Sequence, residues 1–298
     1  MKKIFLIAAV SALAACEDIN KGGEERPNPE IEVVFTSVLN DYSAASGAPV
    51  DWPSNATAGI FMKKNGEELT QQSLLNGADN RKFLVAADGS FQPADENQSF
   101  CYVQDGSKVD FIAYTPYIVA LSSYIFAMDA SSAAPPNASL RYSNNATGKY
   151  KGRSAVSLKF FPVYTKLTLS ISVGTGVSEE SLADFEVSLE GTYPAGDFSI
   201  ATGLVTYTGS KAAIAIPTTD QGTKGETLVL PTVSLPAAGR CLQFTSPALD
   251  FTYTFADTFE FKQGKKYSAD VVISISGISV TFQQIEDWEV EEESGSAN

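Results

Sequence analysis

Short runs of alternating apolar and polar residues, separated by Gly, Pro, Asn and Ser, recur along this 298-residue chain, and helical periodicity is nearly absent. The runs near the C-terminus show the pattern best: Val271, Ile273 and Ile275 fall on one face, Gly277 turns the chain, and residues 278–282 alternate again. A period of two gives each strand one buried and one wetter face. The sequence therefore predicts an all-β protein of antiparallel β-sandwiches.

The length of the chain suits two domains as well as one large domain. The polar stretch 135–153 (PPNASLRYSNNATGKYKGR) is the best candidate for a connection, and an apolar alternating run begins near Ala155. We therefore expect an N-terminal sandwich over residues 30–153 and a C-terminal sandwich over residues 154–298.

The N-terminus has the pattern of a lipoprotein signal peptide. Lys2 and Lys3 precede an apolar run over residues 4–10, and Leu-Ala-Ala-Cys closes the segment at Cys16. This order predicts removal of residues 1–15 and acylation of Cys16. Residues 16–29 contain acidic residues and two prolines and almost no apolar residues, which predicts a flexible tether. No run approaches the roughly 20 apolar residues of a transmembrane helix.

The chain contains no histidine and carries a formal net charge of −14. Catalytic relays through histidine and His-based metal sites are therefore excluded for this chain alone. Nucleic acid is an unsuitable partner because no basic face is visible. The paired carboxylates, such as Glu67-Glu68 and Glu179-Glu180, lie in polar surroundings and indicate solvated charge. We expect no enzyme activity, no cofactor and no metal site.

Two further features leave alternatives open. Cys101 and Cys241 could pair outside the cytoplasm, but we expect two buried, unpaired thiols in different domains. A platform that stacks against sugars is one interpretation of six aromatic residues, and a place in the core is the other: Trp52, Trp288, Tyr114, Tyr117, Tyr124 and Tyr142.

Short motifs in a consistent order resemble those of the fimbrillin-like lipoproteins of type V pili. The motifs are 58–61 (AGIF), 111–117 (FIAYTPY), 156–160 (VSLKF), 166–169 (KLTL), Phe198 with Thr202-Gly203, 229–231 (VLP), 264–267 (GKKY) and 285–288 (IEDW). Each motif is short, so the resemblance rests on their number and order across nearly the whole chain.

The resemblance implies two transthyretin-like β-sandwich domains in tandem and a structural or adhesive subunit that assembles by β-strand exchange. In that family a protease removes the lipidated N-terminus with the first strand, and a strand of the next subunit fills the groove. Carried onto this chain, residues 31–39 are the candidate removable strand, with Ile31, Val33 and Phe35 facing inward. The candidate donor or closing strand lies within residues 278–290 and has the apolar residues Ile278, Val280, Phe282, Ile285 and Trp288.

Two departures from the family pattern refine this expectation. In the family the protease is arginine-specific and cuts after the first strand. The corresponding loop here, residues 40–57, contains no arginine, and Arg26 is followed by Pro27, which argues against such cleavage. After Trp288 only Val290 is apolar, which makes a poor donor strand. The departures favour an anchor, a tip or an accessory subunit over a bulk stalk subunit.

The expected location is the outer membrane and cell surface, as a lipoprotein of the fimbrium. The expected partners are other pilus subunits, in a homo- or hetero-polymer, and a surface ligand of host or bacterium. The alternative function is a surface lipoprotein without catalysis that binds glycans through exposed aromatic residues.

Overall fold

The computed structural model describes residues 30–42, 50–121, 123–132, 134–151, 155–232 and 239–283. Strands dominate this part of the chain, and its 3₁₀ helices, η2 (Glu96–Gln98) and η3 (Glu179–Asp184), are short. The predicted all-β fold class is confirmed. No helix among the described residues is long and apolar enough to cross a membrane. The predicted signal peptide, the tether and Cys16 lie outside the described residues, as do Ile285 and Trp288.

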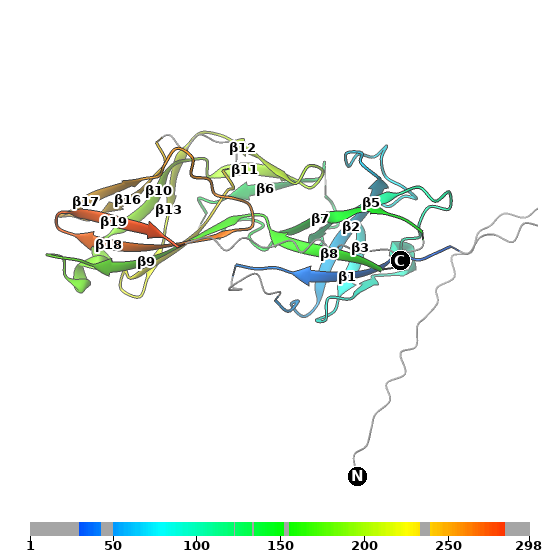
Figure 1. The fold of residues 1–298 in the computed structure, drawn as a ribbon, viewed down its shortest axis with the longest axis horizontal. Helices are drawn as coiled ribbons and strands as arrows, with labels where there is room; N and C mark the ends of the chain where they lie inside the picture. The colour runs from blue at the N-terminus through cyan, green and yellow to red at the C-terminus, as the bar shows by residue number, and fades with distance from the viewer. Residues whose placement is uncertain are drawn as a thin grey trace, which may run out of the picture.

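The first part of the chain forms a seven-stranded sheet in the order β1-β8-β7-β5-β2-β3-β4 (Figure 1). Its strands are β1 (Val34–Leu39), β2 (Ala56–Lys64), β3 (Arg81–Val85), β4 (Phe91–Pro93), β5 (Val109–Thr115), β7 (Arg141–Lys149) and β8 (Ala155–Pro162). The central strand β5 is buried on both faces: Phe111 belongs to one hydrophobic core and Ile112 to another.

The sheet curls so that its two edges approach each other. Thr36 of β1 forms an isolated bridge with Ser90, which immediately precedes β4 at the opposite edge. The curled sheet encloses what we call the N-terminal core, whose large members are Val33, Phe35, Leu39, Trp52, Ile60, Phe83, Phe91, Phe100, Tyr102, Phe111, Leu158 and Phe160. Strand β1 therefore closes the N-terminal core along one side.

The last part of the chain is a two-layer β-sandwich. One layer has the order β14-β15-β9-β18-β19 and the other has the order β13-β10-β16-β17. Their strands are β9 (Thr165–Val173), β10 (Glu186–Thr192), β13 (Ala212–Ala215), β14 (Thr218–Thr219), β15 (Lys224–Val229), β16 (Cys241–Thr245), β17 (Asp250–Thr254), β18 (Lys266–Ser274) and β19 (Gly277–Phe282). Apolar side chains such as Leu169 and Val271 from one layer and Leu189 and Leu242 from the other share one core.

A third sheet joins the two parts. It has the order β12-β11-β6, from strands β6 (Ile125–Asp129), β11 (Ala195–Ser199) and β12 (Leu204–Thr208). The Phe126 ring lies 5.3 Å from that of Tyr114 on β5, and the Phe198 ring lies 5.2 Å from that of Tyr142 on β7. The core of the C-terminal sandwich therefore continues onto the outer face of the seven-stranded sheet.

The change from the first sheet to the C-terminal sandwich comes later in the chain than the composition indicated. Strand β8, which we expected to open the second domain, pairs with β1 and β7 instead. Its alternate residues Val156, Leu158 and Phe160 are buried in the N-terminal core. Nine residues of the polar stretch 135–153 form strand β7 (Arg141–Lys149), so polar composition did not distinguish a strand of this sheet from a linker. The division of the chain into two domains stays a prediction.

Two strand pairs depart from the expected antiparallel arrangement. Strand β1 runs parallel to β8, and β9 runs parallel to β18. Parallel neighbours require long connections, and both pairs join strands that are about a hundred residues apart in the chain. Apolar residues alternate in the same way in parallel and in antiparallel strands. The alternation therefore predicts where strands lie in the sequence but not whether neighbouring strands run parallel or antiparallel.

Cys101 and Cys241 are not joined by a disulfide. Both are half-buried rather than fully buried, which differs from the prediction. Burial raises the pKa of the Cys241 thiol, and the charge of Glu190 raises it further. Cys241 is therefore held in its protonated, less reactive form.

One buried ion pair links the neighbouring strands β2 and β5 of the seven-stranded sheet. Lys63 Nζ on β2 lies 2.8 Å from Asp110 Oδ2 on β5, and both side chains are almost fully buried. Asp110 also accepts hydrogen bonds from the Asn65 side chain and from the backbone amides of Gly66 and Gly148. Burial opposes ionisation of Asp110, but the hydrogen bonds outweigh it and hold its pKa below the usual value.

Candidate functional site

Strand β1 lies in a slot between β8 and the chain segments around residues 89 and 100. On one side it pairs with β8 in a continuous parallel register from Val34↔Ala155 to Leu39↔Phe160. On the other side the contacts are few: the Val33 amide donates to the Phe100 carbonyl and the Ser37 amide donates to the Gly89 carbonyl, each at 2.8 Å. Strand β1 is therefore held by one full ladder and by isolated bonds.

The inward side chains of β1 and its lead are part of the N-terminal core. Val33, Phe35 and Leu39 are buried, and Phe35 is only 1% exposed. The Phe35 ring makes edge contacts with four other rings, at centroid distances of 5.1 Å to Phe111, 5.4 Å to Phe83, 5.7 Å to Phe100 and 6.2 Å to Phe91. Val34, one residue away, is 51% exposed. The alternation expected for residues 31–35 is present: Val33 and Phe35 point into the core, and Ile31 is half-buried against it.

The contact with Gly89 depends on the absence of a side chain. Gly89 has a φ of +79°, and a Cβ added there would lie 2.4 Å from the Ser37 carbonyl oxygen. The Ser37 hydroxyl donates a second hydrogen bond to the Gly89 carbonyl at 3.0 Å. Sequence reasoning did not identify Gly89, because a turn glycine gives no sign of the strand that will lie against it.

Residues 40–42, directly after β1, fasten its end to the rest of the molecule. The Asn40 side chain and backbone amide both donate to the Phe160 carbonyl at 3.0 Å. The Asp41 carboxylate lies 3.0 Å from the Arg141 guanidinium on β7. The Tyr42 hydroxyl donates to the Tyr164 carbonyl, at the junction with the C-terminal sandwich. We call residues 40–42 the latch.

The electrostatics of the latch favour a neutral, hydrogen-bonded tyrosine. Burial raises the pKa of the Tyr42 hydroxyl, with a smaller opposing effect from the Arg141 charge. The guanidinium carbon of Arg141 lies 5.7 Å from the centre of the Tyr42 ring, so the cation also interacts with the aromatic face. These residues were not singled out from the sequence, since their partners are about 100 residues away or more.

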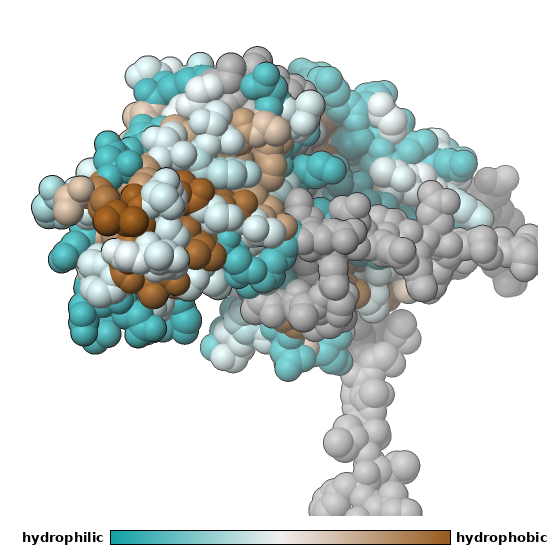
Figure 2. Space-filling view, turned by 60° about the vertical axis from the view of Figure 1, so that its left-hand side comes forward, coloured by the Kyte–Doolittle hydropathy of each residue, from teal (hydrophilic) through white to brown (hydrophobic). Residues whose placement is uncertain are grey.

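The candidate donor strand forms β19, at one edge of the C-terminal sandwich. It pairs antiparallel with β18, and Ile278, Val280 and Phe282 are half-buried against the C-terminal core. The Phe282 ring lies 5.1 Å from Phe259 and 5.6 Å from Phe255. Figure 2 shows apolar residues gathered on this end of the molecule. The structure therefore places β19 in one layer of the C-terminal sandwich, in a different sheet from β1.

Of the two interpretations left open for Trp52, the structure supports a place in the core and not an aromatic platform. Trp52 is 5% exposed, and its ring packs edge-on against Phe91 and Phe160. Its indole nitrogen has no hydrogen-bond partner within the described structure. Tyr114 and Tyr142 are buried as well. The interpretation of Trp52 as a sugar-stacking residue is therefore wrong, because packing against two core phenylalanines buries its faces.

Metal binding is the next possibility for the charged side chains of the described ranges. Within the described ranges no group of three or more Cys, Asp or Glu side chains could hold a metal ion. The acidic pairs Glu67-Glu68 and Glu179-Glu180 include exposed residues in loops or short helical turns. The site with the most specific geometry is thus the slot that contains β1, and its chemistry is the docking of a strand.

Comparison with known proteins gives a consistent result. Residues 44–288 match the family described as "Fimbrillin-like". A protein of Bacteroides uniformis named "Putative fimbrium subunit Fim1C" is 30% identical over 305 residues, which cover 97% of this chain and 96% of that protein.

Two solved structures show the same fold. The crystal structure of a "putative cell adhesion protein" from Bacteroides uniformis has 28% identity and a TM-score of 0.65, covering 87% of this chain and 98% of that one. Another protein with that description, from Bacteroides ovatus, has 17% identity and a TM-score of 0.62, covering 89% and 100%. The overall fold of this chain therefore recurs in proteins of similar size.

Proposed function

The chain belongs to the fimbrillin-like family, and from that premise we propose that it is a structural and adhesive subunit of a cell-surface fimbrium that assembles by exchange of β1. The observation that carries the proposal is the position of β1. It fills an apolar slot, yet only one of its edges has a continuous ladder. A strand of another subunit could replace it by β-augmentation.

The slot defines what an incoming strand must contain. Residues 31–35 read Ile-Glu-Val-Val-Phe, and residues 278–282 read Ile-Ser-Val-Thr-Phe, so both have apolar residues at the same three positions. Strand β19 therefore has the apolar pattern that fits the slot. In this structure, however, Phe282 packs on its own sandwich. A subunit that accepts a strand and keeps its own β19 ends a polymer, so we place it as an anchor, a tip or an accessory subunit rather than in the bulk stalk.

The membrane attachment is part of the proposal. Cys16 would carry a diacyl group and an amide-linked acyl chain, and each buried methylene contributes about 0.8 kcal/mol to membrane binding. Residues 16–29 would then tether the folded part, which begins near Glu30, to the outer membrane. Because residues 40–57 contain no arginine, we place the opening of the slot at displacement of β1 by an incoming strand, which would leave the lipid attached.

The proposed function includes no catalytic activity. The fimbrillin-like family is one of structural and adhesive proteins, and the chain lacks histidine. Its partners would be other fimbrial subunits and a surface ligand of a host or of another bacterium.

Removal of β1 tests the exchange step. A protease recognition sequence placed within residues 43–49 of the mature protein allows cleavage, and mild denaturant then releases residues 16–42. We expect the opened protein to lose stability and to bind a synthetic peptide of residues 31–39. A peptide with aspartate in place of Phe35 is the matched control, because a buried charge without a partner is strongly unfavourable.

Three outcomes separate the parts of the proposal. An opened protein that binds the peptide and stays monomeric supports an accepting terminal subunit. A ladder of oligomers without added peptide shows that β19 of a second copy donates, and assigns the protein to the stalk. An opened protein that is stable, monomeric and indifferent to both peptides contradicts strand exchange.

A further inference from the structure

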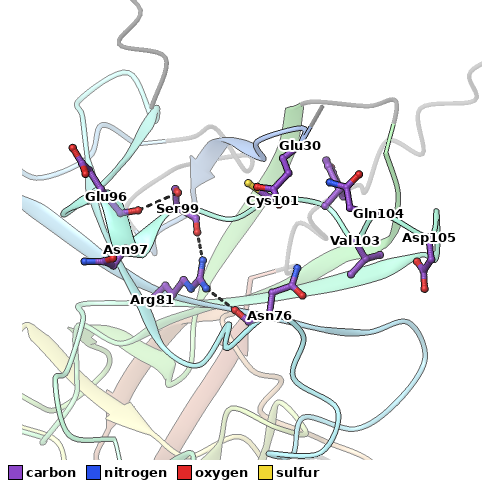
Figure 3. A pocket seen from close by; sticks show the side chains of 11 residues that line it. Glu30, Asn76, Arg81, Glu96, Asn97, Ser99, Cys101, Val103, Gln104 and Asp105 are labelled. Atoms are coloured by element: carbon purple, nitrogen blue, oxygen red, sulfur yellow. Dashed lines mark hydrogen bonds between the residues drawn. The ribbon is translucent and has the colours of Figure 1, made fainter. Parts of the chain in front are cut away.

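Two adjoining hollows lie on the surface beside the start of β1. The larger has a volume of about 610 Å³ and the smaller about 420 Å³, and both are lined by Arg81 and Asn97. Figure 3 shows the larger hollow, where side chains from the lead of β1, from β3 and from residues 96–105 surround an open space. Together the hollows form what we call the β1-end cleft.

The wall at Arg81 is fixed in place. Its guanidinium donates to the Ser99 carbonyl and to the Asn76 carbonyl (Figure 3), and its carbon lies 4.8 Å from the centre of the Phe100 ring. The Ser99 hydroxyl is held by the Glu96 carbonyl at 3.2 Å. A site with walls that are fixed before binding loses less conformational entropy when a ligand arrives.

Several polar side chains of the cleft are available to a ligand. The carboxylates of Glu30 and Glu96 and the amides of Asn76 and Asn97 are exposed, and none has a hydrogen-bond partner within the described part of the chain. Carboxylates only accept hydrogen bonds, whereas each amide both donates and accepts. A ligand with many groups that donate and accept at the same time satisfies this set best.

The smaller hollow adds an aromatic ring. Tyr117 lines it together with Asp79 and Gln98, and is half-buried. Lys82 Nζ lies 5.5 Å from the centre of the Tyr117 ring. An aromatic ring next to amides and carboxylates can contact the apolar face of a pyranose while its hydroxyl groups are hydrogen-bonded.

We propose that the β1-end cleft binds a neutral saccharide, with Glu96 and Asn97 at its centre. A saccharide hydroxyl donates to a carboxylate and accepts from an amide, so one ligand uses both kinds of side chain. A simple amine would use the carboxylates alone and leave the amides unused. Acidic sugars are disfavoured because Glu30, Glu96 and Asp105 surround the larger hollow with negative charge.

The cleft includes one residue that belongs to the lead of β1. Glu30 lines the larger hollow, and the next residue, Ile31, accepts a hydrogen bond at its carbonyl from the Tyr102 amide at 3.0 Å. A ligand that contacts both Glu30 and Asn97 would join the lead of β1 to the neighbouring wall. By linkage, saccharide binding then stabilises the docked form of β1. The binding proposal does not itself depend on strand exchange.

Titration of the mature protein with short neutral oligosaccharides of glucose, galactose, mannose and N-acetylglucosamine tests the proposal. Calorimetry or NMR should show saturable binding by at least one of them, and Glu96→Ala and Asn97→Ala should each weaken it about tenfold or more. Glu179→Ala, an exposed change on the C-terminal sandwich, is the control and should leave affinity unchanged. Sialyllactose and spermidine represent acidic sugars and simple amines.

The proposal is overturned by any of three results. These are the absence of binding by every neutral saccharide at about 10 mM, equal affinity of the Glu96→Ala and Asn97→Ala variants and the unmodified protein, or binding of spermidine alone. Unchanged melting temperatures of the two variants establish that a loss of affinity is not a loss of folding.

Discussion

The Gly89 carbonyl accepts hydrogen bonds from both the amide and the hydroxyl of Ser37, at 2.8 Å and 3.0 Å. This pair joins the open side of β1 to the turn between β3 and β4, and a Cβ at Gly89 would lie 2.4 Å from the Ser37 carbonyl oxygen. Docking of β1 therefore depends on a glycine more than 50 residues away in the chain.

Gly89→Ala should loosen β1. A side chain at a positive φ and in contact with backbone costs about 2–4 kcal/mol. Gly106→Ala is the matched control, because Gly106 has a φ of +77° and nothing lies within 4 Å of the added Cβ. Denaturant unfolding should show a clearly larger loss for Gly89→Ala, and hydrogen exchange should show the loss of protection in β1. Equal losses in both variants would mean that only the positive φ matters.

Phe35→Ala should remove the central side chain of the slot. Its ring contacts four phenylalanines, so truncation leaves a cavity and should cost about 3–5 kcal/mol of unfolding free energy. Val34→Ala, at an exposed neighbouring position, should change it by no more than about 0.5 kcal/mol. Urea denaturation compares the two variants. A small effect of Phe35→Ala would indicate that β1 contributes little to the stability of the N-terminal core.

Tyr42→Phe should open the latch without removing the ring. The change deletes the donor to the Tyr164 carbonyl, and the loss of one buried hydrogen bond costs about 1–2 kcal/mol. The Tyr164 carbonyl keeps its bond from the Gly264 amide, at 3.2 Å. Hydrogen exchange should accelerate at residues 34–40 first. Tyr150→Phe, at an exposed position, is the control, and an exchange pattern identical to it would contradict the role given to the latch.

Asp110→Asn should leave Lys63 buried without its counter-ion. Breaking one partner of a buried pair costs about 3–5 kcal/mol near pH 7. Glu67→Gln, in an exposed pair with Lys64, should cost no more than about 1 kcal/mol.

The Asp110 ion pair also predicts a dependence on pH. The pKa of Asp110 is lower in the folded than in the unfolded protein, so its ionised form stabilises the fold above the unfolded pKa of about 3.9. That contribution is lost as the pH falls through the folded pKa. The difference in stability between the unmodified protein and Asp110→Asn should therefore shrink on acidification from pH 7. A difference that stays constant to pH 2 would show that ionisation of Asp110 does not stabilise the fold.

Much of the strand content could be predicted from the sequence, because the period of two is local. The alternation over residues 31–35 correctly placed Val33 and Phe35 on a buried face, and the same pattern placed Ile278, Val280 and Phe282 against a core. The order of short motifs identified the family, which the comparisons confirm. These features require no knowledge of which strands meet.

The partners of each strand could not be predicted in the same way. Strand β1 pairs in parallel with β8, and β6 pairs with β11, in each case across a long separation in the chain. The passage from the first sheet to the C-terminal sandwich comes only after Pro162. Trp52 packs against Phe160, more than 100 residues later in the chain. No pattern of neighbouring residues could therefore predict that Trp52 is buried.

The amino-acid sequence by itself determined an all-β chain, an N-terminus with the pattern of a lipoprotein signal and the apolar face of strands such as β1 and β19, since alternation, charge and motif order are properties of neighbouring residues. The tertiary structure decided which groups share a site: Ser37 with Gly89, Tyr42 with Tyr164, and Glu30 with Asn97. The physical reason is that hydrogen bonds and close packing act over a few ångströms in space. Separation along the chain does not specify which residues come that close.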